Sequence, residues 1–450
     1  MKPIELRATG SLAAVFAVRL LGLFMIYPVF AAYAGQLRGA TPATIGLALG
    51  AYGLTQGVLQ IPFGLLSDRV GRKTMITLGL VLFGIGSAVA ALSTSIGGVL
   101  LGRAVQGTGA VGSVILATVA DLTREEVRIR AMAIVGMTIG FAFLVAIVVG
   151  PLLAHWVGVS GIFWLTAALA AVGIAIVLGA VPTPARIVRH RDAEAVPALF
   201  GRVLADRELL RLDFAIFALH AILTASFLAV PQLLASSLHL SARGEWLVYL
   251  PVLAASVVVM VPTIIAAEKG ARMKEIFLGT IAVLAASLAA LALAGRHPAV
   301  LVAALVAFFA AFNVMEAMLP SLVTKLAPAD AKGTATGIYS SSQFLGIFFG
   351  GAAGGWAWAY DRATGIFVFG LAVALAWLGV AATMRRPGRY ASHLVHLGAV
   401  ERQALAALAA RLRAAPGVIE AVLAPEEGVA YLKIDRARFD AAAVERIVAG

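Results

Sequence analysis

The sequence contains no cysteine, and only 13% of its 450 residues are charged. The absence of cysteine excludes disulfide bonds and thiolate metal sites. The sequence also lacks a phosphate-binding loop, which argues against a nucleotide-driven pump. It has no arrangement of a nucleophile with a base, which argues against an enzyme. We therefore expect neither an enzymatic activity nor a cofactor, and we predict no metal site.

Apolar residues, in contrast, make up 61% of the chain, and the mean hydropathy is +0.96. A soluble domain of this composition would expose large apolar patches. A bilayer core of about 30 Å is spanned by about 20 apolar helical residues. The sequence thus predicts an all-α membrane protein whose main part has about twelve transmembrane helices. They fall near residues 11–34, 43–66, 74–93, 98–120, 131–154, 161–181, 210–235, 245–267, 275–294, 298–325, 334–357 and 364–384. The first is too long for a signal peptide, so we expect it to be retained.

Basic residues cluster in alternate connections between these helices, at 69–73, 124–130, 186–207, 269–274, 325–332 and 385–389. The intervening loops hold little beyond Arg38, Arg243, Arg296 and Arg362. Because basic loops stay in the cytoplasm, we expect both termini to be cytoplasmic. The net charge of +12 then reflects topology and contact with anionic membrane lipids. Scattered over many loops, it does not favour a nucleic-acid partner.

The chain repeats itself around a polar, proline-punctuated linker at 182–209. Asp68-Arg69 and Arg72 are echoed by Glu268-Lys269 and Arg272, and "FMIYP" in the first helix is echoed by "FLAVP" in the seventh. We predict an N-terminal six-helix half at 1–181, the linker, a pseudo-symmetric C-terminal half at 210–386 and a small domain at 387–450. Two such halves with a site between them are an architecture of secondary transporters.

The stretch "GLLSDRVGRKT" concentrates charge between two apolar runs, where the second helix meets the third. Its pattern resembles the signature loop of the major facilitator superfamily, and the likeness of the chain extends over about residues 10–385. The resemblance implies a cytoplasmic latch that closes in one conformation and opens in the other. Its expected members are Gly64, Asp68, Arg69, Gly71, Arg72 and Lys73, with Asp121 as the partner of Arg72. A simpler alternative is that these charges only set the topology, and that Asp121 only caps the next segment.

Two further motifs resemble those of the same superfamily. "LGRAVQGTG" places Arg103 inside the fourth helix, where an arginine is costly in lipid and must face the protein interior or a cavity. Gly150-Pro151 in the fifth helix resembles the antiporter motif of drug exporters, although alanines stand at positions 146 and 154 where glycine is usual. A kink with packing of small residues would explain the second motif equally well.

The tail differs in kind from the rest of the chain. It predicts a βαββα order, with strands at "YASHLVHL" and around the turn in "GVIEAVLAPEEGVAYLKI". This order resembles the YAM domain, a small α+β ferredoxin-like module, and together with "FNVMEAMLPSL" and "KGTATGIYSSSQFLG" it resembles the YajR subfamily of proton-driven exporters. His393 and His396 lie three residues apart on a strand and point to opposite faces, which argues against a metal site. The module could make a regulatory contact or self-associate.

Few ionisable groups fall inside the predicted helices. Glu316 is the only carboxylate deep in one of them, and such a group can exchange a proton near neutral pH, as histidine does. The alternatives are a static ion pair between Glu316 and Arg19, and a purely structural role for His220. The candidates for proton coupling or for lining a cavity are Glu316, His220, Arg19, Arg103 and Asp213.

These patterns predict a secondary transporter of the inner membrane that binds protons and a small-molecule substrate. The preferred hypothesis is proton-driven antiport, exporting an amphipathic small molecule or drug by alternating access. A proton-coupled importer of the same fold and a membrane sensor or scaffold without transport activity remain as alternatives. The direction of flux in liposomes under a proton gradient would separate exporter from importer.

Overall fold

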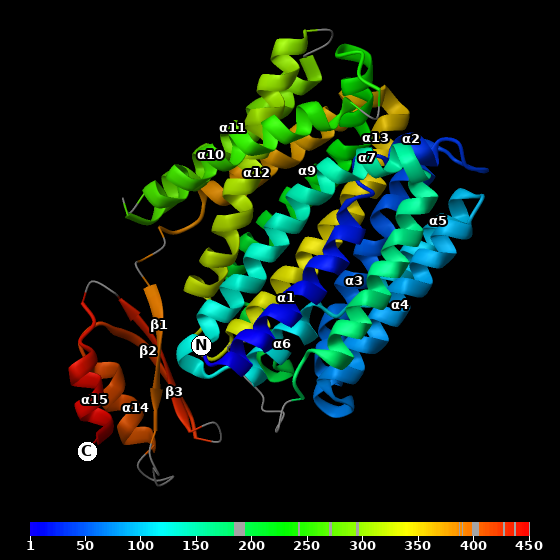
Figure 1. The fold of residues 1–450 in the computed structure, drawn as a ribbon. Coiled ribbons are helices and arrows are strands. Elements are labelled where there is room, and N and C mark those ends of the chain that lie inside the picture. The colour runs from blue at the N-terminus through cyan, green and yellow to red at the C-terminus, as the bar shows by residue number, and fades with distance from the viewer. Residues whose placement is uncertain are drawn as a thin grey trace.

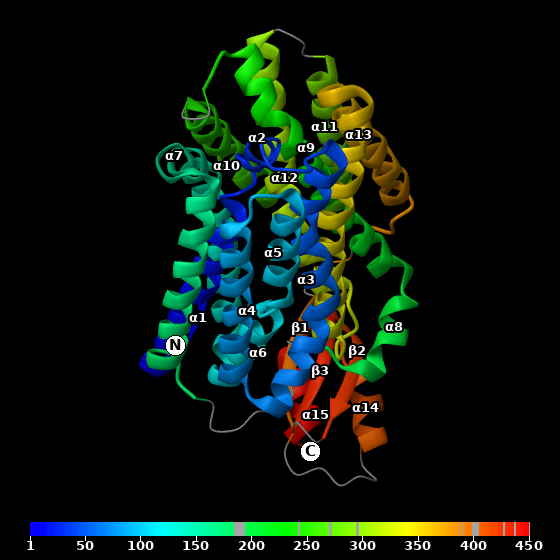
Figure 2. The ribbon, with the colours of Figure 1, turned by 90° about the vertical axis from the view of Figure 1, so that its right-hand side faces the viewer.

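A computed structural model describes residues 1–183, 194–241, 244–269, 272–293, 297–386, 388, 390–397, 405–425, 428–435 and 438–449. A bundle of long helices forms the main body, and a small sheet with two helices lies at one end of it (Figure 1). We call this end, where residues 194–206 also lie, the linker end, and the opposite one the far end (Figure 2). Arg186, Arg189, Arg191, Arg243, Arg296 and Arg389, which entered the topology prediction, lie outside the described residues, as does the side chain of Lys269.

The first half of the bundle contains α1 (Pro3–Phe24), α2 (Phe30–Ala34), α3 (Pro42–Val70), α4 (Arg72–Leu92), α5 (Ile96–Thr108), α6 (Gly112–Leu122) and α7 (Glu125–Gly179). Two short elements, η1 (Pro197–Leu199) and α8 (Phe200–Leu204), lead into the second half. It contains α9 (Arg207–Ser237), α10 (Trp246–Lys269), α11 (Met273–Leu293), α12 (Pro298–Leu326) and α13 (Lys332–Ala382).

Two of these helices are too long to cross a bilayer once. At about 1.5 Å per residue, the 55 residues of α7 and the 51 residues of α13 would each extend roughly 80 Å as straight rods. Instead α7 breaks at Gly158, which has φ 67°, and α13 breaks at Asp361 and Arg362, so each forms two passes. Within the described residues, nine helices are long and apolar enough to span a membrane, with α5 and α6 counted together as the single span Ile96–Leu122. Counting two of them twice and adding the 29-residue α3 gives the predicted twelve passes.

The boundaries of the first predicted helix differ from those in the structure. The helix begins at Pro3, well before residue 11, and ends at Phe24, after which the chain makes turns before α2. The first turn contains Glu5, whose carboxylate accepts a hydrogen bond from the backbone nitrogen of Lys2. Because polar residues lie in this turn, hydropathy alone placed the beginning of the helix too late.

Glycines bring α3 and α13, one from each half, into backbone contact at the far end. A Cβ added to Gly46 would lie 2.8 Å from the Cα of Gly355, and one added to Gly50 would lie 2.8 Å from the carbonyl oxygen of Phe348. Gly351 faces the same stretch of α3, so no side chain could be added there either. The two halves are therefore closely packed at the far end, as small residues permit in membrane helices.

The C-terminal domain has the predicted βαββα order. Its elements are β1 (Tyr390–His396), α14 (Leu405–Ala414), β2 (Val418–Ala424), β3 (Val429–Asp435) and α15 (Ala441–Ala449). The three strands form an antiparallel sheet in the order β1-β3-β2, with the helices on one face (Figure 1). Ala424, Val429 and Tyr431 pack against Ala329, in the connection between α12 and α13. The domain thus contacts the bundle at the linker end.

Candidate functional site

The connection between α3 and α4 is a single glycine. Gly71 has φ 103° and ψ 139°, a conformation that side chains disfavour, and it both ends α3 and begins α4. This sharp turn places Asp68, on the last turn of α3, next to Arg72, on the first turn of α4. The backbone conformation of a single residue, Gly71, therefore brings the charged side chains of this loop together.

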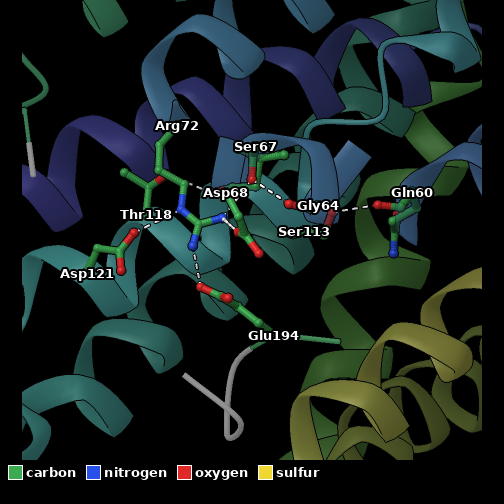
Figure 3. A network of polar contacts seen from close by, with 10 residues as sticks. Gln60, Gly64, Ser67, Asp68, Arg72, Ser113, Thr118, Asp121 and Glu194 are labelled. Atoms are coloured by element: carbon green, nitrogen blue, oxygen red, sulfur yellow. Dashed lines mark hydrogen bonds and ion pairs between the residues drawn. The ribbon is translucent and has the colours of Figure 1, made fainter. Parts of the chain in front are cut away.

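Arg72 lies at the centre of a buried ion network (Figure 3). Its Nη1 donates to Asp68 Oδ1 at 2.6 Å and its Nε donates to Asp121 Oδ2 at 2.8 Å. Its Nη2 donates to the Glu194 carboxylate, which comes from the linker between the halves. The Arg72 side chain is only 1% exposed and Asp121 is fully buried, so water screens these charges poorly.

The linker segment that carries Glu194 is also attached to the second half. Its backbone lies against Gly333, at the beginning of α13, so closely that a Cβ on Gly333 would overlap it. One step further, the backbone nitrogen of Val196 donates to Thr334 Oγ1 at 2.9 Å. We call residues 194–196 the strap, because they connect the Arg72 network to the first turn of α13.

The other predicted members of the latch have different surroundings. Lys73 donates to the carbonyl of Val181 at 2.9 Å, at the end of the first half, whereas Arg69 is exposed to the surroundings. Gly64 faces Ser113 of α6, whose hydroxyl donates to the carbonyl of Gln60 at 2.8 Å (Figure 3). The structure therefore brings Asp68, Arg72 and Asp121 together, and it leaves Arg69 outside the network.

A cavity of about 150 Å³ lies between the halves, next to this network. The linker-end portions of α3 and α13 line it, together with α1 and α6. Its apolar lining includes Phe16, Leu20, Phe24, Ile61 and Phe344, and its polar lining includes Arg19, Gln56, Gln60, His220 and Gln343. Asp68, Arg72 and Glu194 also line it. The cavity thus combines an apolar wall with a few polar groups, as small-molecule sites do.

Arg19 and Arg103 are both fully buried in the first half but have different roles in the packing. Arg19 donates to Tyr52 Oη at 2.5 Å and to Gln56 Oε1 at 2.6 Å, and it lines the cavity. Arg103 donates to Gln106 Oε1 at 3.0 Å and to the carbonyl of Leu49 at 3.3 Å. Arg103 is not among the residues that line the cavity.

In the second half, Glu316 of α12 lies near His220 of α9. Its Oε2 is 3.8 Å from His220 Nε2, and its Oε1 accepts a hydrogen bond from Gln343 at 3.4 Å. Gln343 Nε2 is in turn 2.8 Å from His220 Nε2. Within the described part of the chain, the expected alternative of an ion pair between Glu316 and Arg19 is not found. Asp213 is buried two helical turns before His220.

Gly150 and Pro151 lie where α7 passes the break after α1. A Cβ on Gly150 would overlap the carbonyl oxygen of Met25, and Pro151 lies inside α7. These contacts agree with close packing, which was the simpler of the two interpretations of this motif. Among the described residues there is also no group of three or more His, Cys, Asp or Glu side chains that could hold a metal ion.

Comparisons with known proteins agree with this architecture. The sequence profile of the Major Facilitator Superfamily matches residues 12–351, and that of the YajR YAM domain matches residues 401–450. The chain belongs to the major facilitator superfamily. It is 44% identical, over 97% of its length and 95% of the relative's, to the inner membrane transport protein YajR of Escherichia coli. It is 35% identical, over 78% of its length and 90% of the relative's, to an uncharacterized transporter of Buchnera aphidicola.

Solved structures of the superfamily share the fold. A D-xylose-proton symporter superposes with a TM-score of 0.66 at 16% identity, covering 84% of this chain and 98% of the other. The human organic anion transporter MFSD10 superposes with a TM-score of 0.60 at 18% identity, covering 85% of this chain and all of the other. The protein is therefore a transporter of the YajR type, a multi-pass protein of the inner membrane, and not an enzyme.

Two features of this superfamily member were missed by sequence reasoning. Glu194 was treated only as part of a polar linker, although it is one of few acids in a basic stretch, which was a usable signal. The glycines at 46, 50, 53 and 57 are spaced by three or four residues along one helix face, as in small-residue helix contacts. Their partners on α13 are about 300 residues away, so the sequence alone did not pair them.

Proposed function

We propose that this transporter exports an amphipathic small molecule in exchange for protons, by alternating access. The observation that carries the proposal is the cavity between the halves, which has different closures at its two ends. At the far end, glycine contacts hold α3 against α13. At the linker end, the strap and the Arg72 network add a polar connection between the halves, from Arg72 through Glu194 and Val196 to Thr334 of α13.

The Arg72 network is suited to act as a latch. Its members come from α3, α4, α6 and the strap, and the strap is attached to α13 of the other half. If the halves rock apart at the linker end, the strap must leave Arg72 or Gly333. Charge contacts in partly buried geometry contribute up to about 2 kcal/mol each, enough to change a two-state population by well over tenfold. By the distribution of basic loops, we assign the linker end to the cytoplasm.

Proton coupling is assigned to Glu316, with His220 as its modulator. Glu316 lies in the middle of α12, its Oε2 has no hydrogen-bond partner in the described part of the chain, and the nearest basic group is a histidine. A carboxyl group held among helices is costly when charged and unpaired, so gaining or losing a proton changes its interactions strongly. The connecting residue Gln343 contacts both groups and lines the cavity. Occupation of the cavity can therefore alter the surroundings of Glu316.

We also propose that the C-terminal domain regulates this latch. Glu420 on β2 binds Arg202 of α8 at 2.6 Å and accepts from the backbone nitrogen of Ala329 at 3.2 Å. Arg202 also binds Asp330 at 3.0 Å, just before α13 begins. The domain thus contacts both the linker, at Arg202, and the connection that leads into α13, at Ala329. A chain that ends at Arg386 should still bind substrate but change its rate of transport, and loss of membrane insertion would contradict a purely regulatory role.

Flux measurements in liposomes test the proposed direction and coupling. A screen for ligands that raise the melting temperature of the purified protein supplies the transported compound. An imposed proton gradient should drive this compound opposite to the proton flow, and a protonophore should abolish the movement. Flux in the same direction as the protons would instead identify an importer, and no movement of any stabilising ligand would favour a sensor.

A further inference from the structure

The guanidinium group of Arg19 is incompletely bonded although it is buried. The residue is 1% exposed, and its recorded hydrogen bonds, to Tyr52 Oη, Gln56 Oε1 and the carbonyl of Gly109, all leave from Nη2. Its Nε is buried without any partner among the described residues. Because Arg19 also lines the cavity, the bonding capacity that remains is available to a molecule inside it.

Arg19 also lacks a countercharge. The three groups that bind it are neutral, and the described part of the chain contains no carboxylate within ion-pair distance of it. Arg72, the other buried arginine of the cavity lining, binds three carboxylates. A buried charge without its partner costs several kcal/mol, which is why intramembrane arginines mark functional sites.

The aromatic rings near Arg19 do not remove this imbalance. Its guanidinium carbon lies 5.8 Å from the ring centre of Tyr52 and 5.6 Å from that of Phe83. Such contacts compensate a cation only in part, by about 0.5–2 kcal/mol. Arg103 has a similar contact with Tyr52, at 5.2 Å, but it does not line the cavity, so it serves as a structural counterpart.

The acids that line the cavity are already engaged elsewhere. Asp68 and Glu194 both bind Arg72 at the linker end, within the latch. The polar lining near Arg19 consists of amide groups, Gln56 and Gln60, and Gln56 donates to Gln60 Oε1 at 2.9 Å. The apolar side chains of Phe16, Leu20 and Phe24 extend from α1, the helix that carries Arg19.

We propose that Arg19 binds the anionic head group of an amphipathic organic anion, whose apolar body packs against the Phe16, Phe24 and Phe344 wall of the cavity. This inference rests on the proposed transport function and names the substrate class of the same cavity. Carboxylates, sulfonates and phosphates share the planar or clustered oxygens that accept more than one guanidinium N–H group. The anion supplies the countercharge that the chain itself does not provide.

Four probes with the same aromatic body test the proposal. Naphthalene-2-sulfonate and 2-naphthoate carry an anionic head, 2-naphthamide a neutral one and 2-naphthylmethylammonium a cationic one. Binding to the purified full-length protein is measured by calorimetry and by the shift in melting temperature, without a proton gradient. We expect at least one anion to bind about tenfold or more tightly than the neutral and cationic analogues.

Variants then locate the preference within the cavity. Arg19→Gln should abolish the preference for anionic over neutral and cationic probes. Arg19→Lys should keep part of this preference because the positive charge remains, and Arg103→Gln should keep all of it. Preference for the cation, no preference in the wild-type protein, or full preference in Arg19→Gln would each overturn the proposal, and the first two outcomes do not depend on the folding of any variant. Because binding is measured without a gradient, an anion that binds but is not driven by protons contradicts only the proposed coupling.

Discussion

The two halves carry related connections between their second and third helices, but among the described residues only the first of these connections forms a buried ion network. In the first half, Arg72 is buried and binds three carboxylates. In the second half, Glu268 binds Lys325 at 3.1 Å with 53% of its side chain exposed, and Arg272 is exposed. The two connections are therefore similar in sequence but differ in the burial and the ion pairing of their charged side chains. The difference arises because Arg72 in the first connection contacts α6 and the strap, whereas the described Glu268 and Arg272 of the second connection are exposed.

In the proposed mechanism, this asymmetry gives the two halves different functional roles. The first half holds the latch and Arg19, which has no countercharge among the described residues, and the second half holds the proposed proton-exchanging pair of Glu316 and His220. Coupling then requires the halves to communicate: the strap connects the Arg72 network to α13, and Gln343, which contacts His220, lines the cavity that both halves share. Mutations in equivalent positions of the two halves should have unequal effects.

The largest effect is expected for Arg72→Gln. Removing one partner of a buried ion pair costs about 3–5 kcal/mol, and here three carboxylates lose their cation. Thermal unfolding in detergent should show a clearly lower melting temperature, and transport should be lost. Arg69→Gln, one turn away and exposed, is the control and should change stability by no more than about 0.5 kcal/mol. Equal melting temperatures of the two variants would refute the central place of Arg72.

Glu316→Gln should separate transport from the proton gradient. The amide keeps the shape of the side chain but cannot take up or release a proton, so proton-driven flux should fall by at least about tenfold while gradient-free exchange of substrate continues. Glu275→Gln, an exposed acid of the same half that binds Arg386, is the matched control. Full proton-driven flux in Glu316→Gln would move the coupling site to His220 or Asp213.

A smaller effect is expected for Gly333→Ala, which tests the strap. The added methyl group would overlap the backbone of Glu194 and displace it, so Arg72 would lose one of its three carboxylates. Overpacking of this kind costs about 1–3 kcal/mol. A cysteine placed at Ser340, which lines the cavity in this cysteine-free chain, should react several-fold faster with a polar thiol reagent. Gly279→Ala, where the added methyl meets open space, should leave that rate unchanged; equal rates in both variants would remove the strap from the latch.

The sequence predicted those parts of the fold and of the candidate site whose determinants are local. The apolar runs gave the helices, the tail gave βαββα, and the spacing of Asp68, Gly71 and Arg72 placed the charged turn correctly. The features that could not be predicted from the sequence depend on contacts between residues that are distant in the chain. Glu194 contacts Arg72 only because residues 194–196 lie beside the cavity, between the Arg72 network and α13. The role of the glycines of α3 becomes clear only from their contacts with α13. Similarly, the lack of a countercharge at Arg19 is visible only once all its neighbours are placed.

The smallest effect is expected for Glu268→Gln, the counterpart of Asp68 in the second half. The pair it forms with Lys325 is exposed to solvent, and such pairs contribute about 0–1 kcal/mol because water screens the charges and two long side chains must be ordered. The variant should therefore keep its melting temperature and its flux, and the accessibility of a cysteine at Ser340 should not change. Asp68→Asn, in contrast, removes a charge from the buried network and should raise that accessibility and reduce transport. If both variants behave alike, the asymmetry seen in one conformation does not persist through the cycle, and the second connection must form its own network when the far end opens.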